Sequence, residues 1–573
     1  MTSTATRTLR HRLVAALTVL LAVLASTLVV APPAHAYVTI SGAGSSWSAN
    51  AIDAWRKNVA QYGMVVNYAP TGSSDGRNQY RQGTVQFAAS DIPYGIRDGV
   101  GADPPPSQAH PFAYLPVTAG GTTFMYNLKI GARRVTNLRL SGENIVKIFT
   151  GQLSRWNDPA IARDNPGLRL PAIKIVPVVR SDGSGSTAQL TQWMISQYRS
   201  LWNTYCNRAH RTPCTQTSFY PIVASAGMVA QAQDLGVAGY VSQGQANGAI
   251  GYVQYSYAIQ AGFPVAKMLN SAGYYTEPTA GHVAVSLLKA RINTNKADPN
   301  VYLTQDLTQV YIDKDPRAYP LSGYSYFIVP TSQATVSTQQ GGTLGDFGNY
   351  ALCQGQTQVD ALGYSALPIN LVKAGQQQLA KIPGAKGTNF TIAKCHNPTF
   401  STNGTNTLAV KDPKPPACDK QGSTQCATGT GGAHQDTPIS NGGASGGNGN
   451  SNGNGNGNGN GTSGNNNVGG GPTSSRSHSA SAGPTKSAPV ACNPDTGGCA
   501  PTDGGPQSGD PNVNANPTSA SASLGDGMEV ALMAVAAALL LGLALGPPLI
   551  AQLGARRRAR GGGQWGPGAG SGR

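Results

Sequence analysis

Apolar and polar positions alternate with two different periods along residues 37–405. Runs rich in β-branched and aromatic residues predict strands over residues 64–69, 85–89, 122–127, 173–179 and 324–329. Apolar residues at helical spacing predict helices over residues 49–62, 76–82, 143–149 and 188–198. Because strands alternate with helices, the pattern indicates an α/β sheet packed against helices. A head of about 370 residues is too long for one compact core, so we expect two lobes.

Three loops rich in glycine and serine stand near predicted helix starts, at residues 42–47, 71–76 and 180–187. Glycine lets the backbone approach a ligand closely, and serine adds a hydroxyl donor. A loop that leads into a helix also presents N–H groups at the positive end of the helix dipole, which suits a tetrahedral oxyanion. Asp91 follows an apolar strand between the second and third loops. One such loop is equally well explained as a turn or a helix cap, but three of them predict an anion site.

Other motifs fit these loops less well. The first loop lacks the third glycine of a dinucleotide fingerprint because Trp47 occupies that position, and the third loop lacks the Gly-Lys-[Ser/Thr] of a P-loop. Residues 72–76 match the Gly-x-Ser-x-Gly of a hydrolase nucleophile elbow. A hydrolase with Ser74 as nucleophile needs an acid and then a histidine, for which Asp182 and His282 follow in chain order. Nothing near those two residues supports such roles, so the hydrolase stays the weaker alternative.

The two ends of the chain predict export and anchoring. Residues 1–36 have the basic, apolar and small-residue order of a secretory signal, with an uncleaved anchor as the alternative. Residues 528–553 hold an apolar run long enough for one transmembrane helix. The basic tail at 554–573 favours a cytoplasmic C-terminus. We therefore expect a single-pass protein of the cell membrane with its large N-terminal part outside the cell.

Composition changes between the head and the apolar run. Residues 406–527 become rich in Gly, Asn, Ser and Pro, which predicts a disordered stalk. Eight cysteines in an exported chain favour disulfides, and proximity pairs Cys206 with Cys214, Cys353 with Cys395, Cys418 with Cys426, and Cys492 with Cys499. Zinc is the rival, since His210 and His396 lie near cysteines, but no Cys-x-x-Cys spacing supports it. The formal charge of +16 suits anion attraction, and no motif indicates a nucleic-acid partner.

The loops belong to a longer ordered series that resembles the phosphate-binding protein of the phosphate-specific ABC transporter, the PstS family. The series covers roughly residues 38–375 and includes residues 40–47, 72–74, 89–91, 149–158, 180–186, 248–253 and 319–326. The resemblance implies a venus-flytrap (type II) periplasmic binding fold, with lobe one at 37–117 and 320–405 and lobe two at 118–319. It also implies a binding protein and not an enzyme, with no cofactor, a monomeric head and an ABC permease as partner.

The resemblance further implies a ligand set for inorganic phosphate. Its members are Ser46 and Trp47 on the first loop, Ser73 on the second, Asp91 as the carboxylate, Arg180 as the guanidinium with Asp182 as its pairing acid, and Ser184, Gly185 and Ser186 as donors on the third. A guanidinium can give a bidentate charged contact to the anion. A carboxylate can accept the proton of HPO₄²⁻, which sulfate lacks, so it penalises the wrong anion.

The chain departs from the family pattern at several positions. Ser46 and Ser186 replace threonines and keep the hydroxyl, Trp47 replaces a smaller aromatic residue, and Asp75 adds an acid beside the second loop. An inward-facing Asp75 would weaken anion binding. The stalk and the apolar run are also unusual for the family, and they leave open a role in cell-surface sensing or adhesion.

Overall fold

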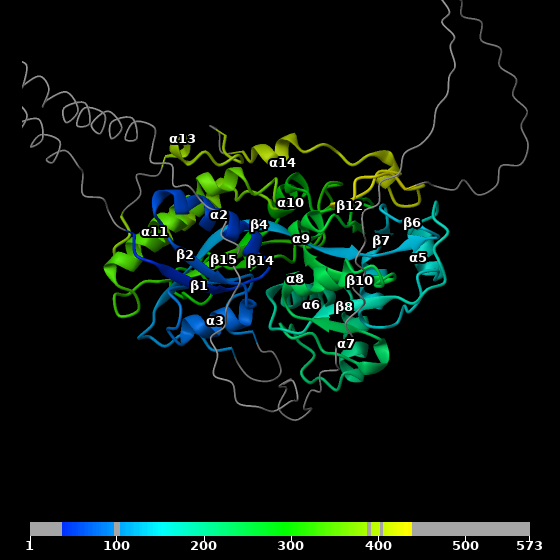
Figure 1. Ribbon diagram of the computed structural model, residues 1–573, viewed down its shortest axis with the longest axis horizontal. Helices are drawn as coiled ribbons and strands as arrows, with labels where there is room; N and C mark the ends of the chain where they lie inside the picture. The colour runs from blue at the N-terminus through cyan, green and yellow to red at the C-terminus, as the bar shows by residue number, and fades with distance from the viewer. Residues whose placement is uncertain (1–36, 97–102, 387–390, 402–404, 438–573) are drawn as a thin grey trace, which may run out of the picture. The chain divides into compact units, whose positions relative to one another are not determined.

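The computed structural model describes residues 37–96, 103–386, 391–401 and 405–437 (Figure 1). The strands are β1 (Ile40–Gly44), β2 (Val66–Ala69), β3 (Phe87–Ser90), β4 (Phe112–Tyr126), β5 (Lys129–Ile130), β6 (Arg133–Arg134), β7 (Arg139–Leu140), β8 (Val176–Arg180), β9 (Val229–Gln231), β10 (Ala249–Gln254), β11 (Val265–Leu269), β12 (Tyr275–Thr276), β13 (Arg291–Ile292), β14 (Gln305–Asp306) and β15 (Ser322–Pro330). The helices are α2 (Ala49–Val59), α3 (Ser73–Arg81), α4 (Gly142–Phe149), α5 (Pro159–Asp164), α6 (Gly185–Gln197), α7 (Arg199–Arg208), α8 (Gln233–Val241), α9 (Tyr255–Gln260), α10 (Ala280–Leu287), α11 (Thr338–Leu352), α12 (Ile369–Leu379), α13 (Ile392–Cys395) and α14 (Thr407–Lys411).

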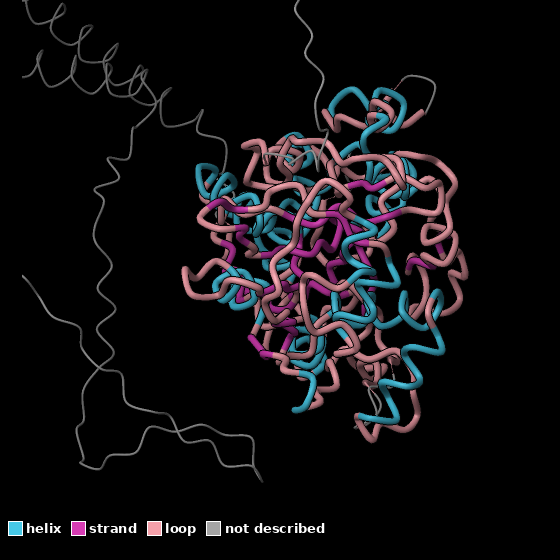
Figure 2. Tube along the Cα trace, turned by 90° about the vertical axis from the view of Figure 1, so that its right-hand side faces the viewer, coloured by secondary structure: helices cyan, strands magenta, loops and turns pink. Residues whose placement is uncertain are grey.

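One long strand joins two halves of a mixed sheet whose main path runs β2-β1-β3-β15-β4-β10-β8-β9. β1 pairs in parallel with β2 and β3, and β15 pairs antiparallel with β3. The first part of β4 pairs with β15, whereas its last residues pair with β10. Every residue of β4 is buried, as expected for a strand covered on both faces. The strands lie inside the molecule, with helices and loops around them (Figure 2).

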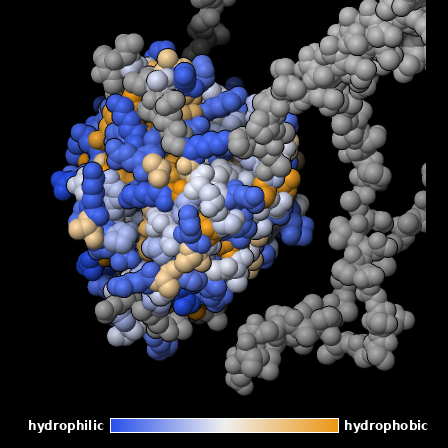
Figure 3. Space-filling model, turned by 90° about the vertical axis from the view of Figure 1, so that its left-hand side faces the viewer, coloured by the Kyte–Doolittle hydropathy of each residue, from blue (hydrophilic) through white to orange (hydrophobic). Residues whose placement is uncertain are grey.

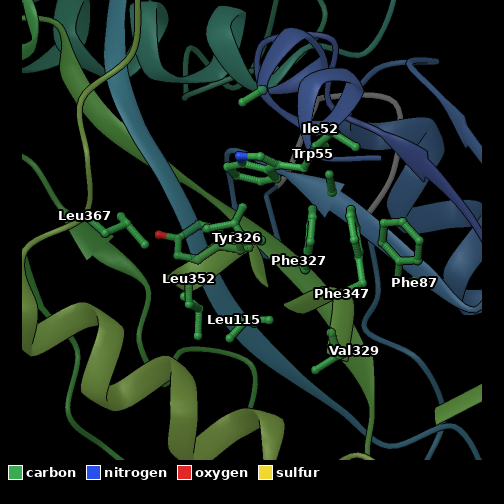
Figure 4. Packing of buried hydrophobic residues seen from close by; sticks show 14 of the residues in the cluster. Ile52, Trp55, Phe87, Leu115, Tyr326, Phe327, Val329, Phe347, Leu352 and Leu367 are labelled. Carbon is green, nitrogen blue, oxygen red and sulfur yellow. The ribbon is translucent and has the colours of Figure 1, made fainter. Parts of the chain in front are cut away.

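The first half of the sheet has its own aromatic core (Figure 4). Phe327 of β15 stacks on Phe347 of α11 with ring centroids 5.9 Å apart, and Phe87 of β3 lies 5.1 Å from Phe327. Trp55 of α2 meets Phe327 edge-on at 6.4 Å. Such offset and edge-on contacts are the favoured arrangements of aromatic rings, so they fix how α2 and α11 sit on the sheet.

The second half packs around a separate core. Trp156, Trp193 and Trp202 are all buried there, among aliphatic residues of α4, α6 and α7. The indole N–H of Trp156 donates to the carbonyl of Gly248 at 3.0 Å, which satisfies its buried polar atom. Two cores on one sheet confirm the predicted two-lobed α/β class, and we name them lobe one (β1, β2, β3, β15) and lobe two (β8, β9, β10).

Two predicted helices begin earlier than expected. α6 starts at Gly185 and not at residue 188, because the Ser184 hydroxyl accepts the N–H of Thr187 and caps the helix. α3 starts at Ser73 and not at residue 76. Glycine and serine lower helix propensity, which hid both first turns in the sequence. As a result, residues predicted to lie in loops form the N-terminal turns of helices.

The prediction that residues 406–527 form a disordered stalk is wrong for the first part of that range, up to residue 437. Residues 405–437 form a strap, drawn in yellow in Figure 1, that includes α14 and follows the head from α13 to the region of β6. Arg139 of β7 donates to the carbonyls of Cys418 and Ser423 at 2.8 and 2.7 Å, and Lys267 of β11 pairs with Asp419 at 2.6 Å. The composition concealed these specific contacts, which order a segment with few apolar residues.

Three predicted disulfides are present, namely Cys206–Cys214, Cys353–Cys395 and Cys418–Cys426. The Cys492 and Cys499 pair, the signal at 1–36, the stalk beyond 437 and the span at 528–553 lie outside the described residues. Helices in the described ranges are all too short or too polar for a membrane span. The same ranges contain no His, Cys, Asp and Glu cluster suited to a metal ion. The face in Figure 3 is mostly hydrophilic, with small scattered apolar spots.

Candidate functional site

The predicted loops meet where the two lobes touch. The N–H of Ser74, at the start of α3, donates to the carbonyl of Gly183 at 3.0 Å. A Cβ atom on Gly185 would lie 2.5 Å from a carboxylate oxygen of Asp91 and 2.7 Å from the Ser73 hydroxyl. Only glycine permits so close an approach, which explains its place at the first residue of α6.

Asp91 is the acidic centre of lobe one's side of the site. It is 4% exposed, and both its oxygens accept from the Ser45 hydroxyl at 2.8 and 2.9 Å. The Ser73 hydroxyl donates to it at 3.0 Å. Burial raises the pKa of Asp91 to about 6, and the nearby charge of Asp234 acts in the same direction, against the hydroxyls that favour the ionised form. The carboxylate is therefore poised between its acceptor and donor forms.

Arg180 is the cationic centre on lobe two's side. It is 2% exposed, and it donates through Nε and Nη2 to Asp182, the acid expected to pair with it, at 2.7 and 2.5 Å. Nη2 also donates to the Ser46 hydroxyl at 2.9 Å, and Nη1 donates to Asp234 at 2.5 Å. These four contacts use four of the five guanidinium N–H groups. The bidentate contact expected for an anion is thus made to Asp182 instead.

The charges around Arg180 reinforce one another. Burial alone would lower the pKa of Arg180, but the charges of Asp234 and Asp182 outweigh burial and raise it. Burial would likewise raise the pKa of Asp182, but the hydrogen bonds and charge of Arg180 outweigh it and lower that pKa. Arg180 and Asp182 therefore form a fixed ion pair at neutral pH.

Two acidic or hydroxyl residues of the site, Asp234 and Ser45, were not predicted from the sequence. Asp234 is fully buried, follows β9 and stands in the first turn of α8. Its strand, loop and helix order matches that of the other site loops, but residues 230–233 contain no glycine or serine to mark it. Ser45 was overlooked beside Ser46, although its hydroxyl, and not that of Ser46, contacts Asp91.

Hydrogen-bond donors gather at the site where α3 and α6 begin. The buried Ser186 hydroxyl lacks a hydrogen-bond partner among the described residues. α3 begins at Ser73 and α6 at Gly185, so the first N–H groups of both helices have no carbonyl within their own helix to donate to. Buried donors are rarely left unpaired in folded proteins, so this cluster is suited to an external acceptor.

The remaining predicted site residues take other positions. Ser184 uses its N–H on the carbonyl of Ser218 and its hydroxyl as the α6 cap. Trp47 is buried, and its indole N–H donates to Thr122 at 3.1 Å. Asp75 faces outward and accepts from Gln79, so it does not enter the site.

The arrangement needed for a Ser74 hydrolase is absent from the described residues. The Ser74 hydroxyl donates to Ser218 at 2.9 Å, and Asp182 is committed to Arg180. His282 lies on α10, where its Nδ1 contacts the carbonyl of Glu277 at 2.8 Å and its Nε2 faces Asp412 at 3.8 Å. Ser74 therefore has neither of the partners that would activate it.

Comparison with known proteins agrees with this geometry. A family model described as "PBP superfamily domain" matches residues 29–354. The phosphate-binding protein PstS of Xylella fastidiosa (strain Temecula1) is 32% identical over 337 residues, which are 59% of this chain and 83% of that protein. PstS of Pasteurella multocida is 30% identical over 363 residues, covering 63% of this chain and 94% of that protein. PstS 3 of Mycobacterium tuberculosis is 26% identical and covers 58% and 83%.

Solved structures are similar too. One is the phosphate-binding protein of Stenotrophomonas maltophilia, with 17% identity, a TM-score of 0.42, and coverage of 64% of this chain and 99% of that one. Another is a phosphate ABC transporter substrate-binding protein with bound phosphate from Clostridium perfringens, with 15% identity, a TM-score of 0.36, and coverage of 58% and 100%.

Proposed function

Because the chain belongs to the PstS family of phosphate-binding proteins, we propose that it binds inorganic phosphate between its two lobes and passes the anion to an ABC permease. The observation that carries the proposal is the unpaired buried hydroxyl of Ser186, together with the N–H groups at the starts of α3 and α6. A phosphate ion that leaves water needs many donors to replace its hydration shell. The first turns of α3 and α6 supply them without a net cationic charge.

The carboxylate of Asp91 gives the proposed site its selectivity. Above its pKa of about 6 it is ionised, and it then accepts a hydrogen bond from a protonated phosphate oxygen. Sulfate offers no such proton, so its oxygen would face a buried negative charge. The protein binds the anion without covalent chemistry. The hydroxyls of Ser45 and Ser73 donate to the Asp91 carboxylate and hold it in place.

Equilibrium dialysis of the full chain with labelled phosphate tests this function. We expect saturable binding to one site near neutral pH, and a hundredfold excess of sulfate should displace little of the phosphate. Ser186→Ala removes an unpaired donor and should weaken binding by about tenfold. Ser196→Ala, on an exposed position of the same helix, is the matched control and should bind normally. Absence of phosphate binding to the folded wild-type chain would refute the proposal.

The organisation around the head is also part of the proposal. Lobe one comprises 37–117 and 320–405, lobe two comprises 118–319, and residues 528–553 anchor the protein with the head outside the cell. The anchor is supported by the apolar run and by the basic tail that follows it. Protease added to intact cells should release the head, and a head that stays protected would contradict this orientation. Phosphate uptake that depends on this protein would separate transport from a sensing or adhesion role.

A further inference from the structure

Asp234 has no part in the phosphate recognition described above, yet it is the most deeply placed acid of the site. Its Oδ2 accepts from Nη1 of Arg180 at 2.5 Å and from the Ser46 hydroxyl at 2.6 Å. Its Oδ1 accepts the N–H of Gln254 at 2.8 Å. The residue is 0% exposed, so these protein contacts alone stabilise its charge.

Asp234 changes what Ser46 can offer to an anion. The Ser46 hydroxyl gives its one proton to Asp234, while its oxygen accepts from Arg180 Nη2 at 2.9 Å and from the N–H of Asp234 at 3.2 Å. A hydroxyl has one donor and two acceptor positions, and all three are occupied. An unprotonated anion oxygen therefore gains no hydrogen bond from Ser46 in this arrangement.

Asp234 also sets the charge balance of the site. The other buried cation nearby, Arg77, pairs with Asp103 at 2.5 Å and donates to Ser90 at 2.9 Å. Arg77 is therefore neutralised. Of the four aspartates in this region, Asp103 thus pairs with Arg77, Asp182 and Asp234 pair with Arg180, and Asp91 accepts from the hydroxyls of Ser45 and Ser73.

The tyrosines beside Asp234 add no charge to this balance. Tyr257 donates to the carbonyl of Ser46 at 2.6 Å, and Tyr364 donates to the carbonyl of Trp47 at 2.7 Å. Burial raises the pKa of both phenols, with the charge of Asp234 adding to the effect, so both stay neutral. The site consequently carries an excess of negative charge before any anion enters.

We propose, on the basis of the phosphate-binding function above, that Asp234 determines the protonation state in which the site accepts phosphate. The excess carboxylate charge disfavours the dianion and favours dihydrogen phosphate, a monoanion with two hydroxyls to donate. In alkaline solution, where the dianion predominates, the anion is then bound together with an additional proton. Asp234 acts through Arg180, Ser46 and the charge balance, and is a specificity-determining residue.

Calorimetric titration of the full chain with inorganic phosphate tests the proposal. Titrations at about pH 8, in two buffers with different heats of ionisation, measure the protons taken up on binding. We expect proton uptake by the wild-type chain and a smaller uptake by Asp234→Asn. Between about pH 6.5 and 8.5, the phosphate Kd of the wild-type chain should also increase about tenfold more than that of Asp234→Asn, because the variant lacks the buried charge of Asp234.

A conservative variant separates charge from packing. Asp234→Glu keeps the charge and should keep the proton uptake even where its affinity is lower. Asp91→Asn, titrated in parallel, identifies the share of the uptake that belongs to Asp91. Thermal unfolding establishes whether each variant is folded. If Asp234→Asn does not fold, the proton uptake of the wild-type chain, measured in the two buffers, still tests the proposal.

The outcomes are distinct. Equal proton uptake and equal pH dependence in wild type and Asp234→Asn would overturn the proposal and leave Asp234 as a support for Arg180. Wild-type binding without proton uptake at about pH 8 would also overturn it. Absence of phosphate binding at every pH would instead refute the proposed function itself.

Discussion

Replacement of Asp91 by asparagine isolates the carboxylate's contribution to anion choice. The two side chains have nearly the same shape, so the Ser45 and Ser73 contacts at 2.8–3.0 Å can be kept with reoriented hydroxyls. The amide removes the buried negative charge and adds N–H donors, which an unprotonated sulfate oxygen can accept. We therefore expect sulfate binding to improve relative to phosphate binding.

The size of the change follows from the burial of Asp91, which is 4% exposed. A buried polar group without a hydrogen-bond partner costs about 1–3 kcal/mol. When sulfate occupies the wild-type site, the Asp91 carboxylate is such a group, because sulfate has no proton to donate to it. The ratio of the sulfate Kd to the phosphate Kd should thus fall about tenfold to a hundredfold. Competition dialysis of the full chain with labelled phosphate and increasing sulfate measures this ratio.

The pH dependence gives an internal control. Asp91 in the wild-type chain becomes protonated as the pH falls through about 6, and the protonated acid can donate to sulfate. Wild-type discrimination against sulfate should therefore weaken below about pH 6, whereas that of Asp91→Asn should not change there. An unchanged Kd ratio in Asp91→Asn at neutral pH would refute the role of this carboxylate.

Three further predictions concern stability and closure. Because the pKa of Asp91 is raised to about 6, its ionised form destabilises the folded, ligand-free protein at pH 7. This destabilisation disappears as the pH falls through about 6 toward 3.8. Asp91→Asn should therefore raise the free energy of unfolding at pH 7, measured with urea, by about 1–3 kcal/mol. Gly185→Ala places a Cβ atom 2.5 Å from a carboxylate oxygen of Asp91 and should weaken phosphate binding at least about tenfold. Gly239→Ala is its control, because a Cβ atom there meets no other atom within 4 Å. Equal phosphate affinities of the two variants would contradict the close approach of Gly185 to Asp91. Replacing Cys418 and Cys426 by serine opens a loop with a sequence separation of 8, which should lower the unfolding free energy by about 2–3 kcal/mol and increase hydrogen exchange in the strap; unchanged exchange would mean that the strap is held by its polar contacts alone.

The glycine and serine loops were predictable because their signal is local. Ser73 and Gly185 follow a strand and begin a helix. Glycine at such a position indicates by itself that the backbone is closely approached. The boundaries of α3 and α6 were not predictable, since whether glycine and serine join a helix depends on caps and on neighbouring chain segments.

Asp234 and the strap depend on contacts between distant parts of the chain. Asp234 is 54 residues from Arg180 and 188 from Ser46, and its own neighbours in sequence carry no sign of either. The strap residue Cys418 is 279 residues from Arg139, whose guanidinium holds it. Composition describes the average behaviour of such a segment, and a few charge-assisted hydrogen bonds with one disulfide are enough to override it.

A crystal structure of the full chain with phosphate tests the central claim most directly. Our account predicts one phosphate enclosed between the lobes, within hydrogen-bond distance of the N–H groups of Trp47, Gly185 and Ser186, with one protonated oxygen on Asp91. An anion bound elsewhere, or bound to one lobe without contact to the other, would contradict it.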